Sequence, residues 1–308
     1  MNIAYLISAH TDAPQLKRLI DALHKDAEFF IHIDKKSDIT KFTSIIKGEN
    51  IHFLEDRYDV RWGTIIEVYY QMALIQEVLD CRPKTFDRIF FLSGMDYPLW
   101  SNERITQYLE SIGDKEILMG VNMTHPDTPK KQTELYTTAR PFFSIPFLSN
   151  KTNERIGILC RKIKKALGMK KSLTLPNGWT LYKGSAWWCI TYGLAEKLAD
   201  TFYNNREVYK YFVDSFGSAE TFIQTVAFNS EYKSRCIEYD GPYPGLDVLT
   251  PMHFIDYEPV IKVMDETDYE RLIKSDKMFT RKLLSVKSDT LVKLLKDLPP
   301  TPSCKDGE

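Results

Sequence analysis

Two short segments in the second half of the chain carry residue types that could do acid–base chemistry together. Residues 184–191 begin with a Gly-Ser step and continue as an apolar, aromatic strand, and residues 217–225 place an acid, Glu220, near the start of a helical pattern. A strand wall beside one carboxylate suits a pocket in which a substrate group loses a proton, because a carboxylate can act as a general base. The pattern therefore predicts a pocket with Glu220 as its proton acceptor.

Glu220 has a structural interpretation as well. A glutamate two residues after Ser218, at the start of a helix, would cap that helix and offset its dipole. A change to Gln separates the two interpretations, because capping survives it whereas base catalysis falls by roughly two to four orders of magnitude.

The elements that must position these residues alternate in type along the first hundred positions. Strands are predicted over residues 3–9, 29–34, 51–54 and 88–92, and helices over 14–23, 64–79 and 102–109, the first of them capped by Asp12. This order predicts an α/β fold with a mostly parallel central sheet and helices on both faces. Such a sheet binds ligands beyond the carboxyl ends of its strands.

Polar residues stand where the predicted strands end. His10 follows the first strand, Asp34 ends the second, and Ser93, Gly94 and Asp96 form a tight turn after the fourth. A glycine there lets a ligand approach the backbone closely, and Asp96 is expected to bond that ligand. The alternatives are a strand-end histidine bonded to backbone and a purely structural Asx turn. No Gly-x-Gly-x-x-Gly or P-loop pattern follows the first strand, so a nucleotide would be held in another way.

Composition excludes several classes of protein. The 308 residues include 41 basic and 42 acidic ones, so no global field draws the chain to nucleic acid or to an anionic membrane, and any anion must be bound by a local cluster. Five widely spaced cysteines without a Cys-x-x-Cys pair indicate neither a disulfide framework nor a zinc site. There is no basic leader and no apolar run of membrane-spanning length, so we expect a cytoplasmic protein.

The chain is expected to divide into a catalytic domain, residues 1–285, and a C-terminal helix with a flexible tail, residues 286–308. Within the domain, residues 125–180 are predicted to form a loop-rich insertion on the acceptor side, with five prolines and a basic stretch at 161–165. Such charges usually form a solvated face. The alternative is peripheral contact with the phosphates of the inner membrane face.

Seven segments follow one another in a recognisable order. They are residues 4–10, 31–37, Trp62-Gly63, 92–98, 184–187, Glu220 with Gln224-Thr225, and 279–282. Together they resemble the core-2/I-branching β-1,6-N-acetylglucosaminyltransferase family, which also contains the protein xylosyltransferases, over about residues 1–285. The resemblance implies a glycosyltransferase-A type fold, a UDP-sugar donor, inversion at the anomeric carbon and independence of metal ions. The lack of an anchor before the domain favours a bacterial-type member.

The resemblance also implies roles on the donor side. Asp34 matches the acid that holds uridine, and His10, Trp62, Gly63 and the 93–96 turn are assigned to the donor with it. Many nucleotide-sugar transferases bind a divalent ion on an Asp-x-Asp pair, which this chain lacks. A guanidinium and an ammonium can stabilise a diphosphate instead, and Arg281 and Lys282 are assigned this role.

One departure from the family concerns the second cation. The family's upstream basic residue falls near Pro259 here, so Lys262 or Arg281 is expected to replace it. An alternative is that Arg281 and Lys282 form a solvated pair on a helix surface.

The acceptor side is assigned to Ser185, Trp187 and Tyr239. Adjacent tryptophans on a strand point to opposite faces, so Trp187 is assigned to the sugar and Trp188 to the core. Tyr239 stands where family members often carry a tryptophan.

These expectations combine into an inverting, metal-independent glycosyltransferase without a cofactor. It would move a sugar, GlcNAc or xylose, from a UDP-sugar to a glycan or polysaccharide hydroxyl with Glu220 as base. A non-catalytic nucleotide- or carbohydrate-binding protein stays open as the alternative. A phosphatase or nucleotidyltransferase is disfavoured, because the sequence shows no metal-binding carboxylate pair.

Overall fold

The computed structural model describes residues 1–81, 85–141, 143, 145–257 and 260–296. Its central sheet has the strand order β3-β2-β1-β4-β8. The strands are β1 (Ile3–Ala9), β2 (Glu28–Ile33), β3 (Ile51–Phe53), β4 (Arg88–Ser93) and β8 (Trp188–Ile190). All neighbours are parallel except β4 and β8, which run antiparallel. The predicted α/β fold with a mostly parallel central sheet is therefore confirmed.

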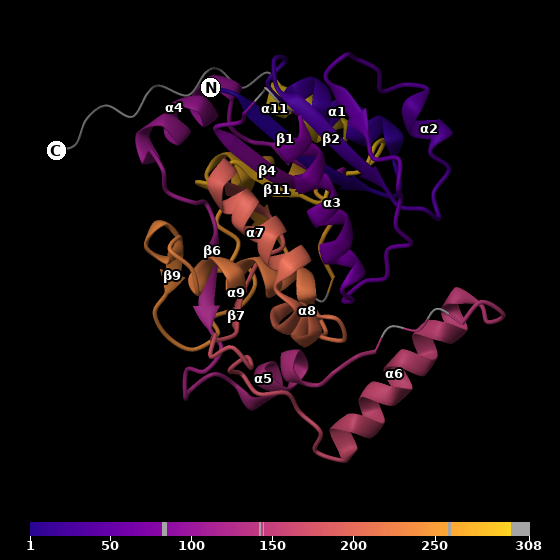
Figure 1. The fold of residues 1–308 in the computed structure, drawn as a ribbon. Coiled ribbons are helices and arrows are strands. Elements are labelled where there is room, and N and C mark those ends of the chain that lie inside the picture. The colour runs from indigo at the N-terminus through magenta and orange to yellow at the C-terminus, as the bar shows by residue number, and fades with distance from the viewer. Residues whose placement is uncertain (82–84, 142, 144, 258–259, 297–308) are drawn as a thin grey trace.

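Alternating side chains of the strands feed two separate cores. Ala4 and Leu6 of β1 point to one face, whereas Tyr5 and Ile7 point to the other, as the period of two along a strand requires. The first face is covered by α3 (Ile66–Asp80), α7 (Tyr192–Asn204), α8 (Arg206–Phe212) and α9 (Phe222–Phe228). The second is covered by α1 (Ala13–Ala22), α2 (Thr40–Thr43) and α4 (Asn102–Ile112). Helices thus lie on both faces (Figure 1).

Two small sheets flank the central one. The first, β10-β11-β5, consists of β10 (His253–Ile255), β11 (Phe279–Arg281) and β5 (Asp96–Pro98), and the second, β7-β6-β9, of β7 (Tyr182–Gly184), β6 (Met119–Asn122) and β9 (Ile237–Tyr239). Each brings residues far apart in sequence side by side, because β5 pairs with β11 and β6 pairs with both β7 and β9.

The first hundred residues fold largely as predicted. Asp12 does cap α1, since its carboxylate accepts the Gln15 N–H. The predicted 93–96 turn is shorter in the structure, because only Gly94 and Met95 turn and Asp96 already belongs to β5.

The insertion contains two helices that the sequence did not indicate, α5 (Lys130–Thr137) and α6 (Asn150–Ala166). The basic stretch 161–165 lies within α6, which projects away from the body of the molecule (Figure 1).

The C-terminal part packs on the β10-β11-β5 sheet. It comprises α10 (Tyr269–Ile273) and α11 (Asp289–Lys296), whose leucines share a third apolar cluster with Tyr97. The predicted helix at 288–295 is thus present, and the tail expected after it lies outside the described residues. Within the described part of the chain no helix is long and apolar enough to cross a membrane.

Candidate active site

Three strand ends meet at one edge of the central sheet. The Asp34 N–H donates to the Ala9 carbonyl at 2.9 Å, and the Gly94 N–H donates to the Ser8 carbonyl at 2.9 Å. These bonds continue the β1–β2 and β1–β4 ladders just beyond the strands. Residues 10, 34 and 94 therefore share one edge, which is where a parallel sheet binds its ligands.

Asp96 is fully buried beside this edge and is engaged on both carboxylate oxygens. Its Oδ1 accepts from Arg281 Nη1 at 3.0 Å, and its Oδ2 contacts the Ser93 N–H at 2.7 Å and His253 Nε2 at 3.1 Å. Burial opposes ionisation, but His253, Arg281 and the Ser93 N–H outweigh it and lower the pKa of Asp96. Asp96 thus anchors a cation and also accepts from the backbone N–H of Ser93, three residues before it, which is not the bond of an Asx turn.

Arg281 lies at the end of β11 and not on a helix surface. Its side chain is 14% exposed, and its guanidinium carbon is 5.1 Å from the centre of the Trp187 ring. The solvated helical pair considered from the sequence is therefore wrong for Arg281. A guanidinium fixed by a carboxylate and an indole is held in place before any anion arrives.

Lys282 follows directly and is half-buried. Among the described residues its ammonium makes no hydrogen bond or ion pair. By contrast, the Lys262 ammonium is 2.6 Å from Asp268, so that candidate second cation is already paired. Pro259 lies outside the described residues.

His10 and Asp34 lie close to these cations. The pKa of His10 is lowered, first by partial burial and then by the positive charges of Arg281, Lys282 and Lys36, whereas Asp34 raises it. These four charged groups therefore all lie near the His10 imidazole. The Asp34 carboxylate accepts the Lys36 N–H at 3.0 Å and pairs with its ammonium at 3.0 Å. We call His10, Asp34, Asp96, Arg281 and Lys282 the strand-edge cluster.

Trp187 and Trp188 separate as predicted. The Trp188 ring is fully buried and stacks on Phe91 with 5.3 Å between ring centres. Trp187 stands just before β8, partly exposed, with its ring 5.3 Å from that of His253. Trp187 therefore lies beside the strand-edge cluster.

Glu220 ends a short 3-10 turn, Ser218–Glu220, that precedes α9. Its carboxylate is 27% exposed and does not cap a helix. Instead Oε2 accepts the Tyr136 hydroxyl at 2.8 Å and lies 3.1 Å from the Lys183 ammonium. The capping interpretation is therefore wrong, and the side chain is available to a ligand.

Lys183 is a part of this site that sequence reasoning missed. It lies on β7 with a side chain that is only 1% exposed, and its ammonium is 5.2 Å from the centre of the Tyr136 ring and 5.1 Å from that of Tyr243. A buried lysine needs a partner charge, and Glu220 supplies it. A single lysine in the sequence of a strand does not indicate which acid will pair with it.

Glu67 of α3 is a second acid that sequence reasoning missed. Its Oε2 accepts the Gly63 N–H at 2.7 Å. Burial raises the pKa of Glu67 to about 8, with the charge of nearby Glu220 adding to the shift. We call Glu220, Lys183, Tyr136 and Glu67 the Glu220 cluster.

Trp62 and Gly63 lie against the Glu220 cluster. The Gly217 N–H donates to the Gly63 carbonyl at 3.0 Å, and the 70% exposed Trp62 ring packs edge-on against Phe216. Gly63 has φ +72°, and a Cβ there would lie 2.5 Å from the Phe216 ring. Only glycine fits this turn.

The predicted strand and helix segments, residues 184–191 and 217–225, do come together. Gln224 of α9 donates to the Ser185 carbonyl at 2.6 Å, and the Ser185 hydroxyl accepts the Trp187 N–H at 3.0 Å. Ser185 is buried and shapes the turn between β7 and β8. Tyr239 pairs with Val121, which pairs with Lys183, so these three residues form one row across the second small sheet.

Tyr70 connects the two clusters along α3, one turn after Glu67. Burial raises the pKa of its hydroxyl, and Glu67, Arg281 and Asp34 are all close enough to influence it. Tyr70 therefore lies within electrostatic range of residues from both clusters.

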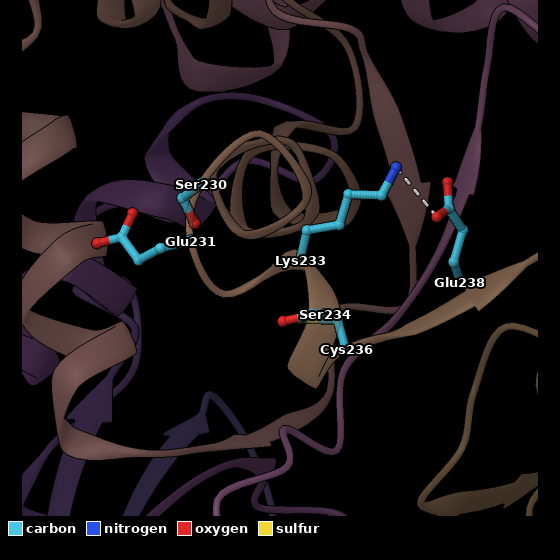
Figure 2. Close-up of a pocket in the computed structure, with 6 residues that line it drawn as sticks. All are labelled: Ser230, Glu231, Lys233, Ser234, Cys236 and Glu238. Carbon is cyan, nitrogen blue, oxygen red and sulfur yellow. Dashed lines mark ion pairs between the residues drawn. The ribbon is translucent and has the colours of Figure 1, made fainter.

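A surface hollow of about 570 Å³ lies elsewhere, around the 3-10 turn Lys233–Arg235 (Figure 2). Glu238 lines it, whereas Tyr239 does not, and neighbouring residues of a strand face opposite ways. The hollow therefore lies on the other face of the small sheet from Lys183.

Among the described residues no three His, Cys, Asp or Glu side chains gather as metal ligands would. The expected independence of metal ions stays a prediction.

Comparison with known proteins gives one family. The family model described as Core-2/I-Branching enzyme matches residues 3–256. A xylosyltransferase of Ciona intestinalis is 25% identical over 241 residues, which are 75% of this chain and 25% of that protein. Human xylosyltransferase 2 is 26% identical over 239 residues, with the same coverage of each chain. This chain thus spans about a quarter of the length of these relatives.

Among solved structures, a cytidylyltransferase from Leptospira borgpetersenii is similar with a TM-score of 0.34 and 17% identity, covering 80% of this chain and 78% of that chain. The family match extends over the central sheet, α3, the Glu220 turn and β10. The chain therefore belongs to the Core-2/I-Branching enzyme family of glycosyltransferases.

Proposed function

We propose that this protein transfers a sugar from a UDP-sugar to a hydroxyl group of a glycan, with inversion at the anomeric carbon and without a metal ion. The observation that carries the proposal is the position of Glu220. Its partly exposed carboxylate is held by Tyr136 and Lys183, and the strand-edge cluster supplies the cations Arg281 and Lys282. A base and two cations are what the reaction needs.

Glu220 acts on the acceptor. Its carboxylate takes the proton of the acceptor hydroxyl while that oxygen forms a bond to the anomeric carbon. The bond from this carbon to the diphosphate oxygen breaks at the same time, and UDP leaves with the electron pair. Attack opposite the leaving group inverts the anomeric centre.

The strand-edge cluster acts on the donor. Negative charge grows on the diphosphate as the bond breaks, and Arg281 and Lys282 stabilise it as fixed donors. Arg281 is held by Asp96, whereas Lys282 has no partner among the described residues and can turn toward phosphate. Asp34 and His10, at the same edge, are assigned to the nucleoside.

The acceptor is assigned to the side of Trp187, Ser185 and Tyr239, beneath the insertion that carries α5. A sugar ring stacks its apolar face on an indole, and the exposed side of Trp187 offers such a platform. We propose GlcNAc or xylose as the transferred sugar. If the acceptor glycan is carried on a lipid, the enzyme would work in contact with a membrane.

The test has two stages. Calorimetric titration with UDP in EDTA should show binding, because the proposed cations are side chains. UDP release should then be measured with UDP-GlcNAc, UDP-xylose, UDP-glucose and UDP-galactose in EDTA. Binding that requires added manganese contradicts metal independence.

A non-catalytic binding protein on the same fold is the second candidate. It predicts UDP binding without UDP release for any donor and acceptor. The exposure of Glu220 argues against it, since the carboxylate remains partly accessible although it is paired with Lys183, and nucleotide binding alone does not require an accessible base.

A further inference from the structure

Among the described residues, the contacts of helix α6 with the rest of the protein lie along one side of the helix. Asn153 is buried and exchanges hydrogen bonds with the backbone of Ile145. Gly157 lies against the Pro141 carbonyl, and Arg161 donates to the Leu135 carbonyl. These contacts recur every four residues, so they define one stripe. The opposite side of α6 faces away from the body of the molecule (Figure 1).

The outward side carries large apolar residues. Leu159 and Ile163 are neighbours at a spacing of four on this side, and other apolar residues lie at the two ends of the helix. The exposed fractions are 87% for Phe147, 56% for Leu159, 50% for Ile163, 69% for Leu167 and 55% for Met169. Single exposed hydrophobic residues are ordinary, but a contiguous group on one element marks an interaction surface.

A basic row runs beside the apolar one. Lys151, Arg155 and Lys162 lie at spacings of four and seven residues, which places them on one line along the helix. All three are exposed, and none forms an ion pair among the described residues. The lysines of the inward side differ, because Lys164 pairs with Asp214 and Lys165 pairs with Glu134.

Charge in this part of the chain is strongly biased. Residues 147–171 contain eight Lys and Arg and one Glu, although the whole protein has a formal net charge of -1. The helix is 17 residues long, or about 25 Å at 1.5 Å per residue, too short to span a bilayer but long enough to lie along one.

We propose that α6 docks this protein on an anionic phospholipid surface. A helix with an apolar row beside a Lys/Arg row lies in the plane of a membrane, with apolar side chains among the acyl chains and ammonium groups at the lipid phosphates. A second copy of the chain is disfavoured as occupant, because two such helices would bring like charges together. Nucleic acid would leave the apolar row in water.

Docking would also orient the candidate active site. The insertion that carries α6 also carries α5, whose Tyr136 bonds Glu220, so the Glu220 cluster is tied to the docking element. Together with the proposed function, which this step requires, the geometry assigns a lipid-linked glycan as the class of acceptor.

Co-sedimentation with vesicles tests the docking itself and needs no catalytic activity. The full chain should bind vesicles of phosphatidylcholine with 30% phosphatidylglycerol, and rising salt should release it. Changing Lys151, Arg155 and Lys162 together to Gln should weaken binding about a hundredfold, since each basic residue near the surface adds about a fivefold factor. Leu159→Gln with Ile163→Gln should weaken it as well.

Matched controls use exposed residues far from α6. Lys25, Lys41 and Lys47 changed together to Gln alter the net charge equally, and Ile45→Gln with Ile237→Gln alters exposed apolar area. Both controls should bind like the unchanged protein. The proposal is overturned if the unchanged protein stays in the supernatant, or if the α6 variants and the controls bind alike.

Light scattering tests the alternative that a second copy of the chain, and not a lipid surface, covers α6. If the α6 variants convert a dimer to a monomer, α6 joins two copies of the chain and the lipid assignment is wrong. Loss of vesicle binding with UDP release on a soluble acceptor intact supports docking. Loss of UDP release while vesicle binding is kept would count against the proposed function and not against docking.

Discussion

Glu220 combines exposure with fixed contacts, and its substitution is the most direct test at the scale of single residues. We expect Glu220→Gln to lower kcat by roughly two to four orders of magnitude, because the amide cannot accept the acceptor proton. UDP affinity should stay within about threefold, since the strand-edge cluster is unchanged. UDP release and UDP titration of the folded variant measure the two effects. Equal losses of kcat and UDP affinity would contradict the role as base.

Lys183 and Glu220 should be coupled in stability. Removing either charge alone leaves the other without its partner, and Lys183 is almost fully buried. In a double-mutant cycle of Lys183→Met and Glu220→Gln, the double variant should be more stable than the sum of the single effects, by about 0.5–3 kcal/mol. Urea denaturation of the four proteins measures the coupling, and strict additivity would show that the contact contributes nothing.

Glu67 should make the protein less stable as pH rises. Burial raises the pKa of this carboxyl from 4.5 to about 8, so the folded protein binds its proton more tightly than the unfolded chain does. The protonated Glu67 carboxyl therefore contributes stability that is fully present below about pH 4.5. This contribution is lost as pH rises from about 4.5 through 8, at up to about 1.4 kcal/mol per pH unit.

Urea denaturation between pH 5 and 8 tests this. Glu67→Gln should flatten the decline, whereas Glu207→Gln, an exposed change on α8, should leave it as it was. A decline that persists unchanged in Glu67→Gln would assign it to other groups.

At the scale of elements, the turn before α3 controls how the Glu220 cluster is built. Gly63→Ala should destabilise the protein by about 1–3 kcal/mol, because the new Cβ would meet the Phe216 ring and the positive φ disfavours alanine. Gly168→Ala is the matched control, since φ is +67° there but nothing lies within 4 Å of its Cβ. Denaturation midpoints of the two variants separate the steric contact from backbone strain.

The strands and most helices of the first hundred residues could be predicted, because their apolar side chains repeat with the period of the element. Strand β1 and helix α1 show this, down to the Asp12 cap. Helix α6 was missed, because its inward stripe is formed by Asn153, Gly157 and Arg161, which give no apolar period.

The same reasoning explains the candidate site. Glu220 and Arg281 could be proposed from residue type and from the family motifs around them. Lys183 and His253 could not, because each becomes part of the site through a partner distant in sequence, Glu220 for Lys183 and Asp96 for His253. Glu67 could not either, because the charge of Glu220 that acts on it lies far along the chain. A sequence shows the type of a charged residue but not the charge that will lie opposite it.

At the scale of the whole molecule, nucleotide binding should stabilise the fold without any metal. In EDTA, UDP at 100 times its Kd adds about 2.7 kcal/mol, which should raise Tm by about 4–8 °C. Lys282→Met should lose much of this shift with little change in the Tm of the free protein, because its ammonium has no partner among the described residues. Lys287→Met, an exposed change five residues later, should keep the shift.

The contacts of Glu220 also give its two oxygens different tasks. Tyr136 and Lys183 both engage Oε2, and no described residue engages Oε1. If Glu220 is the base, as proposed, an incoming alcohol would find only Oε1 open, and the direction of its approach would be set before it arrives. On the proposed mechanism this asymmetry would give regiochemistry a physical origin, since only a hydroxyl that can reach Oε1 while pointing at the sugar carbon would react.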